Sequence, residues 1–153
     1  MPRLRHTIRI GRPIEQVFSY VTTPAHWPEW NPVSINVRDA IDHSLQVGEQ
    51  VTEEFRAAGR RGSVIWTVRE RQAPRRWMIH GETRLGADGS ITYSLAPDGE
   101  GTRFERELAY ELPNPLWRIL DRLWIRRRLK RESADALSRL KAVLEGESGP
   151  KDA

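Results

Sequence analysis

The segment from Pro13 to Pro32, PIEQVFSYVTTPAHWPEWNP, constrains the fold more than any other part of the chain. Proline suits the first position of a helix, where its missing N–H would have no partner, so Pro13 predicts a helix start. Pro24 disfavours helical geometry at the residue before it and predicts the end of that helix. Trp27 and Trp30, three residues apart, then share one face of a second short turn. The first helix is expected to bury the apolar residues at helical spacing, which are Ile14, Val17, Phe18 and Val21.

Strand patterns surround this helical segment. Apolar and polar residues alternate over residues 3–10, which predicts a half-buried strand. Six further segments with strand-like patterns follow, separated by turns that contain glycine or proline. We expect these strands at residues 33–38, 51–55, 63–71, 76–82, 91–95 and 102–112. Strands at this spacing, joined by hairpin turns, predict an antiparallel sheet.

The apolar period changes to a helical one after residue 115, which predicts a long C-terminal helix. The run Arg126–Arg131 within it is charged on nearly every side, so we expect the helix to bend or to be more exposed there. A single domain is expected over residues 1–146, with a disordered tail over residues 147–153. The apolar positions of the helix are Leu116, Ile119, Leu120, Leu123, Ala134, Leu137, Leu140 and Leu144.

Composition limits the classes of function. The 153 residues suffice for one domain with its own core. The absence of cysteine excludes disulfides, thiolate catalysis and thiolate metal sites. The N-terminus lacks the apolar core of a signal peptide, and no apolar run approaches the roughly 20 residues of a transmembrane helix, so we expect a cytoplasmic protein. Arginine greatly outnumbers lysine, which fits a GC-rich bacterial genome.

Charge and motifs narrow the classes further. The formal net charge is +4, but 21 acidic residues are interspersed with 25 basic ones, which favours a solvated surface over a surface that binds nucleic acid. GxSxG, Walker and GxGxxG motifs are absent, so hydrolase, nucleotide and dinucleotide functions have no support. The four histidines are not spaced as metal ligands. We therefore expect no cofactor, no metal and no nucleic-acid partner.

The order of these elements resembles that of one superfamily. The sequence from Pro13 to Pro32, the stretch TVRERQAPRRW (residues 67–77) and the stretch GTRFERELAYELP (residues 101–113) are similar to motifs of the START-like, polyketide cyclase/dehydrase and lipid-transport (SRPBCC) group. The resemblance implies an α+β helix-grip fold. In that fold a curved antiparallel sheet of about seven strands carries two short helices after the first strand, and a long C-terminal helix packs across the sheet.

The resemblance also implies a ligand cavity between the sheet and the long helix. Without a cavity, the same aromatic and aliphatic side chains would pack a closed core. The residues expected to line the cavity are Trp66, Val68, Trp77, Ile79, Tyr93, Phe104, Arg106, Leu108 and Tyr110 from the sheet, and Leu120, Leu123, Trp124 and Leu137 from the helix.

Arg106 has the same strand parity as its apolar neighbours, so its side chain is expected on the inner face. An arginine there is costly unless it is paired or solvated. It would hold an anionic or carbonyl group of a ligand. Alternatively, it occupies an edge position or forms a structural ion pair with Glu53, which has inward parity on its own strand.

Three functions remain open at this point. The first is a cytosolic binding protein for a small hydrophobic or amphipathic ligand, polyketide- or lipid-like. The second is an enzyme of the polyketide cyclase/dehydrase type that uses the same cavity, and the third is an interaction module without a physiological ligand. The binding protein is favoured over the enzyme because no convincing set of catalytic residues emerges.

The basic run suggests one further partner. Arg126, Arg127, Arg128, Lys130 and Arg131 follow two tryptophans on the predicted helix, a pattern that can contact anionic lipid headgroups. The alternative is a solvated flank of the helix, which is the usual environment of an arginine run. The sequence does not predict an oligomeric state.

Overall fold

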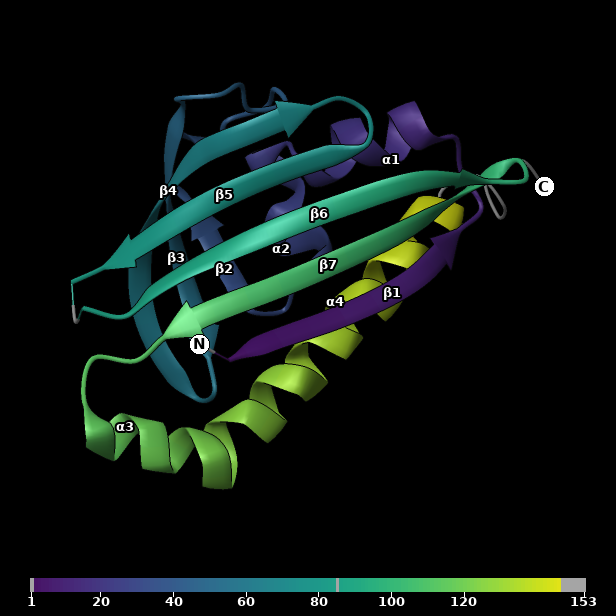
Figure 1. Ribbon diagram of the computed structural model, residues 1–153. Helices are drawn as coiled ribbons and strands as arrows, with labels where there is room; N and C mark the ends of the chain where they lie inside the picture. Colours follow the sequence, from purple (N-terminus) through teal and green to yellow (C-terminus); the bar gives the residue numbers. More distant parts are fainter. Residues whose placement is uncertain (1, 85, 147–153) are drawn as a thin grey trace.

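The computed structural model describes residues 2–84 and 86–146, and the predicted disordered tail lies outside these residues. The described chain forms seven strands, a set of short helices and a long C-terminal helix (Figure 1). The N-terminal elements are β1 (Arg3–Ile10), α1 (Ile14–Val21), a 3₁₀ turn (Pro24–His26), α2 (Trp27–Trp30), β2 (Ser34–Val37) and a second 3₁₀ turn (Arg38–Ala40). The others are β3 (Gln50–Ala57), β4 (Arg60–Gln72), β5 (Arg76–Thr83), β6 (Asp88–Asp98), β7 (Gly101–Glu111), α3 (Pro115–Leu120), a π-helical turn (Asp121–Ile125) and α4 (Arg126–Gly146).

The strands form one antiparallel sheet in the order β1-β7-β6-β5-β4-β3-β2. Consecutive strands from β2 to β7 are neighbours, and β1 closes the other edge by pairing with β7. The sheet curls around α4, which runs beside β1 (Figure 1). The α+β helix-grip class and the seven strands are therefore confirmed.

The predicted helical pair is present after β1. Helix α1 buries its four apolar residues at helical spacing, as expected. Pro13 lies one position earlier than predicted: it has ψ 147° and precedes the helix, and its carbonyl accepts a hydrogen bond from the Val17 amide at 3.1 Å. The Trp27 indole donates to the Val21 carbonyl at 2.9 Å, which folds α2 back against α1. Helix α2 in turn contacts α4, so this segment props the long helix over the sheet.

The long C-terminal helix that the sequence predicts is present, and α4 is helical throughout residues 126–131, whose continuity the sequence left open. A π-helical turn, Asp121–Ile125, separates α3 from α4 and lies before the charged run where a bend was expected. The irregular turn places the Asp121 carboxylate in the interior, where it accepts hydrogen bonds from Tyr110 and Arg126. π-Helical turns inside α-helices commonly lie at bends and at functional sites. No described helix is long and apolar enough to cross a membrane.

The two halves of the helical region differ in burial. In α4 the leucines at 137, 140 and 144 are buried, and Ala136 is buried in place of the predicted Ala134. In α3 no side chain is buried. The core beneath α4 is rich in aromatic rings: Tyr93 lies 5.2 Å from Trp77 and 5.0 Å from Phe104 between ring centroids.

Candidate functional site

A row of four paired residues crosses the concave face of the sheet. Trp77 on β5 faces Tyr93 on β6, Tyr93 faces Arg106 on β7, and Arg106 faces His6 on β1. Directly opposed residues of an antiparallel sheet point to the same side, so these side chains project together into the space beneath α4. The row therefore places an arginine and a histidine beside two stacked aromatic rings.

Arg106 is the charged member of this row and is only 7% exposed. Its Nη1 donates a hydrogen bond to the Ser133 hydroxyl of α4 at 3.2 Å, which connects the sheet to the helix. Among the described residues, its buried Nε has no hydrogen-bond partner, and the buried Nδ1 of His6 has none either. Buried polar atoms are nearly always hydrogen-bonded in folded proteins, so two orphan atoms on opposed residues call for an explanation.

Glu53 adds a buried carboxyl from β3. The Trp66 indole on β4 donates to it at 3.0 Å. Trp66 has room to do so because its partner on β5 is Gly81, where a Cβ would lie 2.6 Å from the indole ring. Burial raises the pKa of Glu53, and the Ser34 hydroxyl, the Trp66 indole and the Arg106 charge partly offset that effect.

The ion pair that the sequence suggested between Glu53 and Arg106 is not formed within 4.0 Å in the described part of the chain. The guanidinium nevertheless acts on its neighbours. Burial raises the pKa of Tyr93 to about 12, and Arg106 opposes that rise. Burial is also the main cause that lowers the pKa of His6, followed by the charges of Arg106 and Lys130.

We call His6, Glu53, Tyr93, Arg106 and Ser133 the interior polar cluster. Its environment favours the neutral forms of His6, Glu53 and Tyr93, so Arg106 is its fixed charge. A guanidinium donates strong hydrogen bonds to carboxylate or carbonyl oxygens. Within residues 2–84 and 86–146, no three His, Asp or Glu side chains are grouped as metal ligands.

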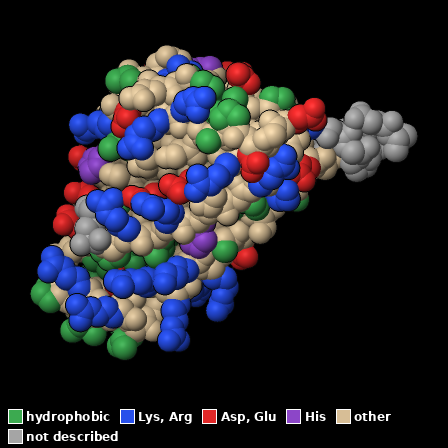
Figure 2. Space-filling view, turned by 45° about the vertical axis from the view of Figure 1, so that its right-hand side comes forward, with side chains coloured by type: hydrophobic (Ala, Val, Ile, Leu, Met, Phe, Trp, Pro, Cys, Tyr) green, Lys and Arg blue, Asp and Glu red, His purple; other side chains and the backbone are tan. Residues whose placement is uncertain are grey.

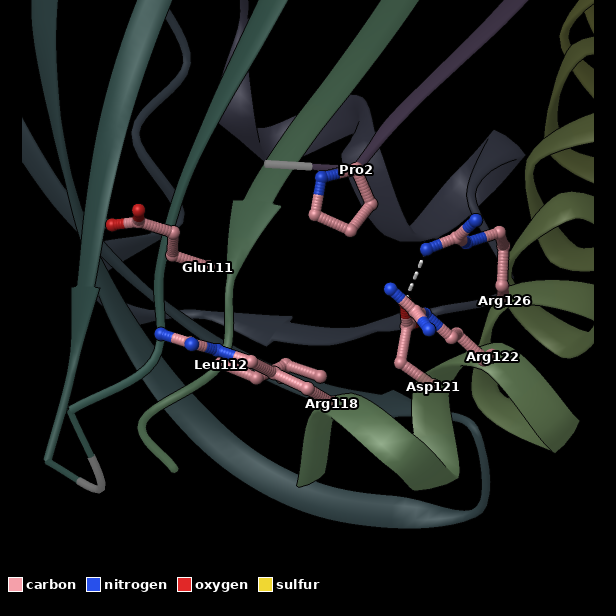
Figure 3. Close-up of a pocket in the computed structure, with 7 residues that line it drawn as sticks. All are labelled: Pro2, Glu111, Leu112, Arg118, Asp121, Arg122 and Arg126. Atoms are coloured by element: carbon pink, nitrogen blue, oxygen red, sulfur yellow. Dashed lines mark hydrogen bonds and ion pairs between the residues drawn. The ribbon is translucent and has the colours of Figure 1, made fainter. Parts of the chain in front are cut away.

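A second polar group joins the sheet to the π-helical turn. The Tyr110 hydroxyl of β7 donates to the buried Asp121 carboxylate, and Arg126 donates to its other oxygen at 2.8 Å. Burial and the adjacent Asp121 raise the pKa of Tyr110. A surface hollow of about 530 Å³ opens beside this group, with arginines on the helical side and Glu111 on the strand side (Figure 3). Its lining residues are Pro2, Glu111, Leu112, Arg118, Asp121, Arg122 and Arg126.

Most residues predicted to line the cavity lie together in the interior, and whether they contact a ligand stays a prediction. Leu108 and Leu120 are half-buried. Leu123 and Trp124 lie on the outer surface instead, because α3 and the π-helical turn extend beyond the covered part of the sheet. The buried members of the set are Trp66, Val68, Trp77, Ile79, Tyr93, Phe104, Arg106, Tyr110 and Leu137.

Sequence reasoning did not single out His6 or Ser133. His6 shares its strand parity with Leu4, Ile8 and Ile10, so the alternation of β1 carried a signal for an inward histidine. Ser133 carried none, because a serine on a charged helix is ordinarily solvated. Only the packing of α4 against β7 brings its hydroxyl to Arg106.

The sequence matches a known family over nearly its whole length. The family is described as polyketide cyclase / dehydrase and lipid transport, and the match covers residues 1–145. Among curated proteins none matches the sequence.

Solved structures share the fold at low sequence identity. Protein TTHA0849 from Thermus thermophilus is 18% identical, with a TM-score of 0.76, covering 97% of this chain and 100% of its own. A conserved protein from Geobacillus kaustophilus is 14% identical, with a TM-score of 0.74 and coverage of 96% and 97%. DynU16, from the dynemicin biosynthetic locus, is 15% identical, with a TM-score of 0.67, and this chain covers 47% of it while 94% of this chain is aligned.

Proposed function

Because the chain belongs to the polyketide cyclase/dehydrase and lipid transport family, we propose that it binds a small hydrophobic or amphipathic molecule, polyketide- or lipid-like, between the sheet and α4. In this proposal a carbonyl or carboxylate of the ligand accepts hydrogen bonds from Arg106. The apolar body of the ligand contacts the aromatic side chains of the same face, such as Trp77 and Tyr93.

One observation carries the proposal. The Arg106 guanidinium is buried beside Tyr93, and its Nε has no partner in the described chain. The orphan Nδ1 of His6 belongs to the residue paired with Arg106 on β1. Leaving buried polar atoms without partners costs stability. A ligand oxygen placed between Arg106 and His6 would satisfy the Nε, and it would do so most strongly if it were charged.

A second candidate is an enzyme of the polyketide cyclase/dehydrase type. The observation that favours it is the presence of His6, Glu53 and Tyr93 around one cation, each with a pKa shifted by burial. Groups of this kind act as general acids or bases when a substrate lies within hydrogen-bonding distance. Fold membership alone does not supply the chemistry, so binding is the first proposal.

The proposal also includes a cellular compartment and a second partner. We propose that binding occurs in the cytoplasm. The contact predicted between anionic membrane and Arg126, Arg127, Arg128, Lys130 and Arg131 stays a proposal that concerns the outer surface rather than the interior. If the interior binds no small molecule, the third function applies, that of an interaction module without a physiological ligand.

Mass spectrometry of the purified protein tests the first proposal, with the native complex compared with an organic extract of the same sample. We expect a bound hydrophobic or amphipathic molecule in the wild type. Titration with 1-anilinonaphthalene-8-sulfonate, which pairs an apolar body with an anionic group, supplies a defined probe. Arg106→Ala should weaken the binding of this probe by roughly 10-fold or more, which is the loss expected for a charge-assisted hydrogen bond.

Arg103→Ala is the matched control, because Arg103 lies on the same strand but is exposed on the outer face. It should retain both the co-purified molecule and the affinity for the probe. Arg106→Lys keeps the positive charge but loses the planar guanidinium with its several N–H donors. It replaces the alanine variant in the titration if that variant does not fold. Equal affinities in folded Arg106 variants and the wild type would remove Arg106 from the site.

A further inference from the structure

Four large apolar side chains are exposed on α3 and the π-helical turn. Leu116, Ile119, Leu123 and Trp124 are 64%, 56%, 69% and 67% exposed. Leu116, Ile119 and Leu123 are separated by three, four and seven residues, a spacing that places them on the same side of a helix. Trp124 directly follows Leu123 and extends this surface. We call these four residues the α3 apolar patch.

The patch belongs to a segment that is fixed to the domain on its other side. Asn114 caps α3 by accepting a hydrogen bond from the Trp117 amide at 3.1 Å. The Arg60 guanidinium, from the start of β4, lies 4.3 Å from the centre of the Trp117 ring. The Tyr110 hydroxyl holds Asp121 of the π-helical turn. The segment therefore presents the patch outward at the end of the molecule where α3 projects (Figure 1).

Positive charge surrounds the patch. Residues 115–131 contain seven basic side chains and one acidic one, Asp121, which is buried and paired with Arg126. Lys and Arg side chains lie together with hydrophobic side chains at the lower end of the molecule in Figure 2, the end where α3 lies in Figure 1. The basic residues are Arg118, Arg122, Arg126, Arg127, Arg128, Lys130 and Arg131.

The charge decides which partner the patch fits. In a two-fold dimer, the same surface of each copy would meet at the interface, so the arginines of one copy would face those of the other. An anionic bilayer combines an apolar layer for the leucines and the tryptophan with negative headgroups for the arginines. A helix with one apolar face and flanking basic residues is the usual form of an interfacial membrane helix.

We propose that the α3 apolar patch docks on the surface of anionic lipid bilayers, with α3 and the π-helical turn lying in the plane of the interface. Leu116, Ile119, Leu123 and Trp124 enter the headgroup and acyl boundary. Arg122 and the basic residues that begin α4 contact the phosphates. This docking extends the membrane contact proposed for the basic run at the start of α4. It requires no ligand in the interior, so it stands or falls separately from the proposed ligand binding.

Flotation of the full chain with lipid vesicles tests the proposal. We expect binding to vesicles of phosphatidylcholine mixed with phosphatidylglycerol at low salt, weaker binding at physiological salt, and little with phosphatidylcholine alone. Leu123→Glu should weaken binding by about 10-fold or more, since it replaces a leucine that would insert into the bilayer with a negative charge. Arg127→Gln should weaken it by about fivefold.

Matched variants separate docking at the patch from general adhesion. Val47→Glu alters an apolar side chain that is 60% exposed in the loop before β3, and Arg69→Gln removes an exposed arginine of β4. Both should bind like the wild type. Vesicles with brominated acyl chains should quench the tryptophan emission, and Trp124→Phe should reduce that quenching more than Trp117→Phe does. Trp27, Trp30, Trp66 and Trp77 are buried, and Trp117 is half-buried with the Arg60 guanidinium over its ring.

Three results would overturn the proposal. The first is no flotation with anionic vesicles at either salt concentration. The second is an equal loss of binding in the patch variants and in their matched controls. The third is a concentration-dependent dimer that Leu123→Glu abolishes in a chain that does not bind vesicles, which would assign the patch to a second copy.

Discussion

The C-terminal helical region has two halves with the same apolar spacing and opposite surroundings. In α4, Leu140 is 0% exposed, whereas Leu123 in the π-helical turn is 69% exposed. The leucines of α4 lie under the curled sheet, and α4 also contacts α2. The apolar residues of the other half lie beyond the covered part of the sheet, and the principal neighbour of α3 is the turn that follows it.

The difference shows that apolar residues at helical spacing predict which face of a helix packs against something. The spacing does not predict what that face packs against. In α4 the cover is the chain's own sheet, so these leucines stabilise the fold. In α3 the described residues supply no such cover. Large exposed apolar patches on soluble domains commonly mark interaction surfaces. The same kind of residue therefore has a structural role in one half and, in our proposal, a binding role in the other.

Truncation of a leucine in each half tests the comparison most strongly. Leu140→Ala should lower the free energy of unfolding by about 2–5 kcal/mol, because it leaves a cavity in a packed core. Leu123→Ala, the matched control, should change it by no more than about 0.5 kcal/mol. Urea unfolding followed by circular dichroism measures both. Similar losses in the two variants would show that the halves are not distinct in their contribution to stability.

The hinge between the halves gives the next largest expected effect. Tyr110→Phe removes the hydroxyl that donates to buried Asp121 and should cost about 1–3 kcal/mol of unfolding free energy. Because this bond holds the π-helical turn on the sheet, amides of residues 115–125 should also exchange hydrogen faster, with α4 less affected. Unchanged exchange in α3 would mean that Tyr110 does not anchor the exposed half.

The interior beneath α4 should also make the free energy of unfolding depend on pH, and we expect this effect to be the smallest of the three. The pKa of Glu53 is raised in the folded state, so the folded chain holds this proton more tightly than the unfolded chain does. The contribution of Glu53 to stability is then fully present below the ordinary value of 4.5 and is lost as pH rises through the raised pKa. Relative to Glu53→Gln, the wild type should lose unfolding free energy as pH rises through that window.

Glu54→Gln removes a carboxyl from the next position of β3 and is the matched control for that measurement. Urea unfolding over a series of pH values compares the three proteins. A pH dependence of the same sign and size in both variants would contradict a special role of burial at Glu53.

Arg106 and Ser133 show which part of the candidate site could be predicted from the sequence and which part could not. The inward parity of Arg106 was readable from β7, because a period of two fixes which residues share a face. Its contact with Ser133 was not readable, since the rotation and offset of α4 over the sheet are set by packing. The ion pair suggested with Glu53 followed from parity alone, and parity does not bring together residues of β3 and β7, which are not neighbours in the sheet.

By itself, the sequence determined the family, the seven strands, the two short helices after β1 and the face of each strand, because these depend on local periods and on proline positions. Tertiary structure alone decided that a π-helical turn begins at Asp121, where one buried carboxylate is held by Tyr110 and Arg126. It also decided that Leu140 is covered while Leu123 is not. Burial depends on where the sheet ends in space, and the spacing of apolar residues along one helix carries no information about that edge.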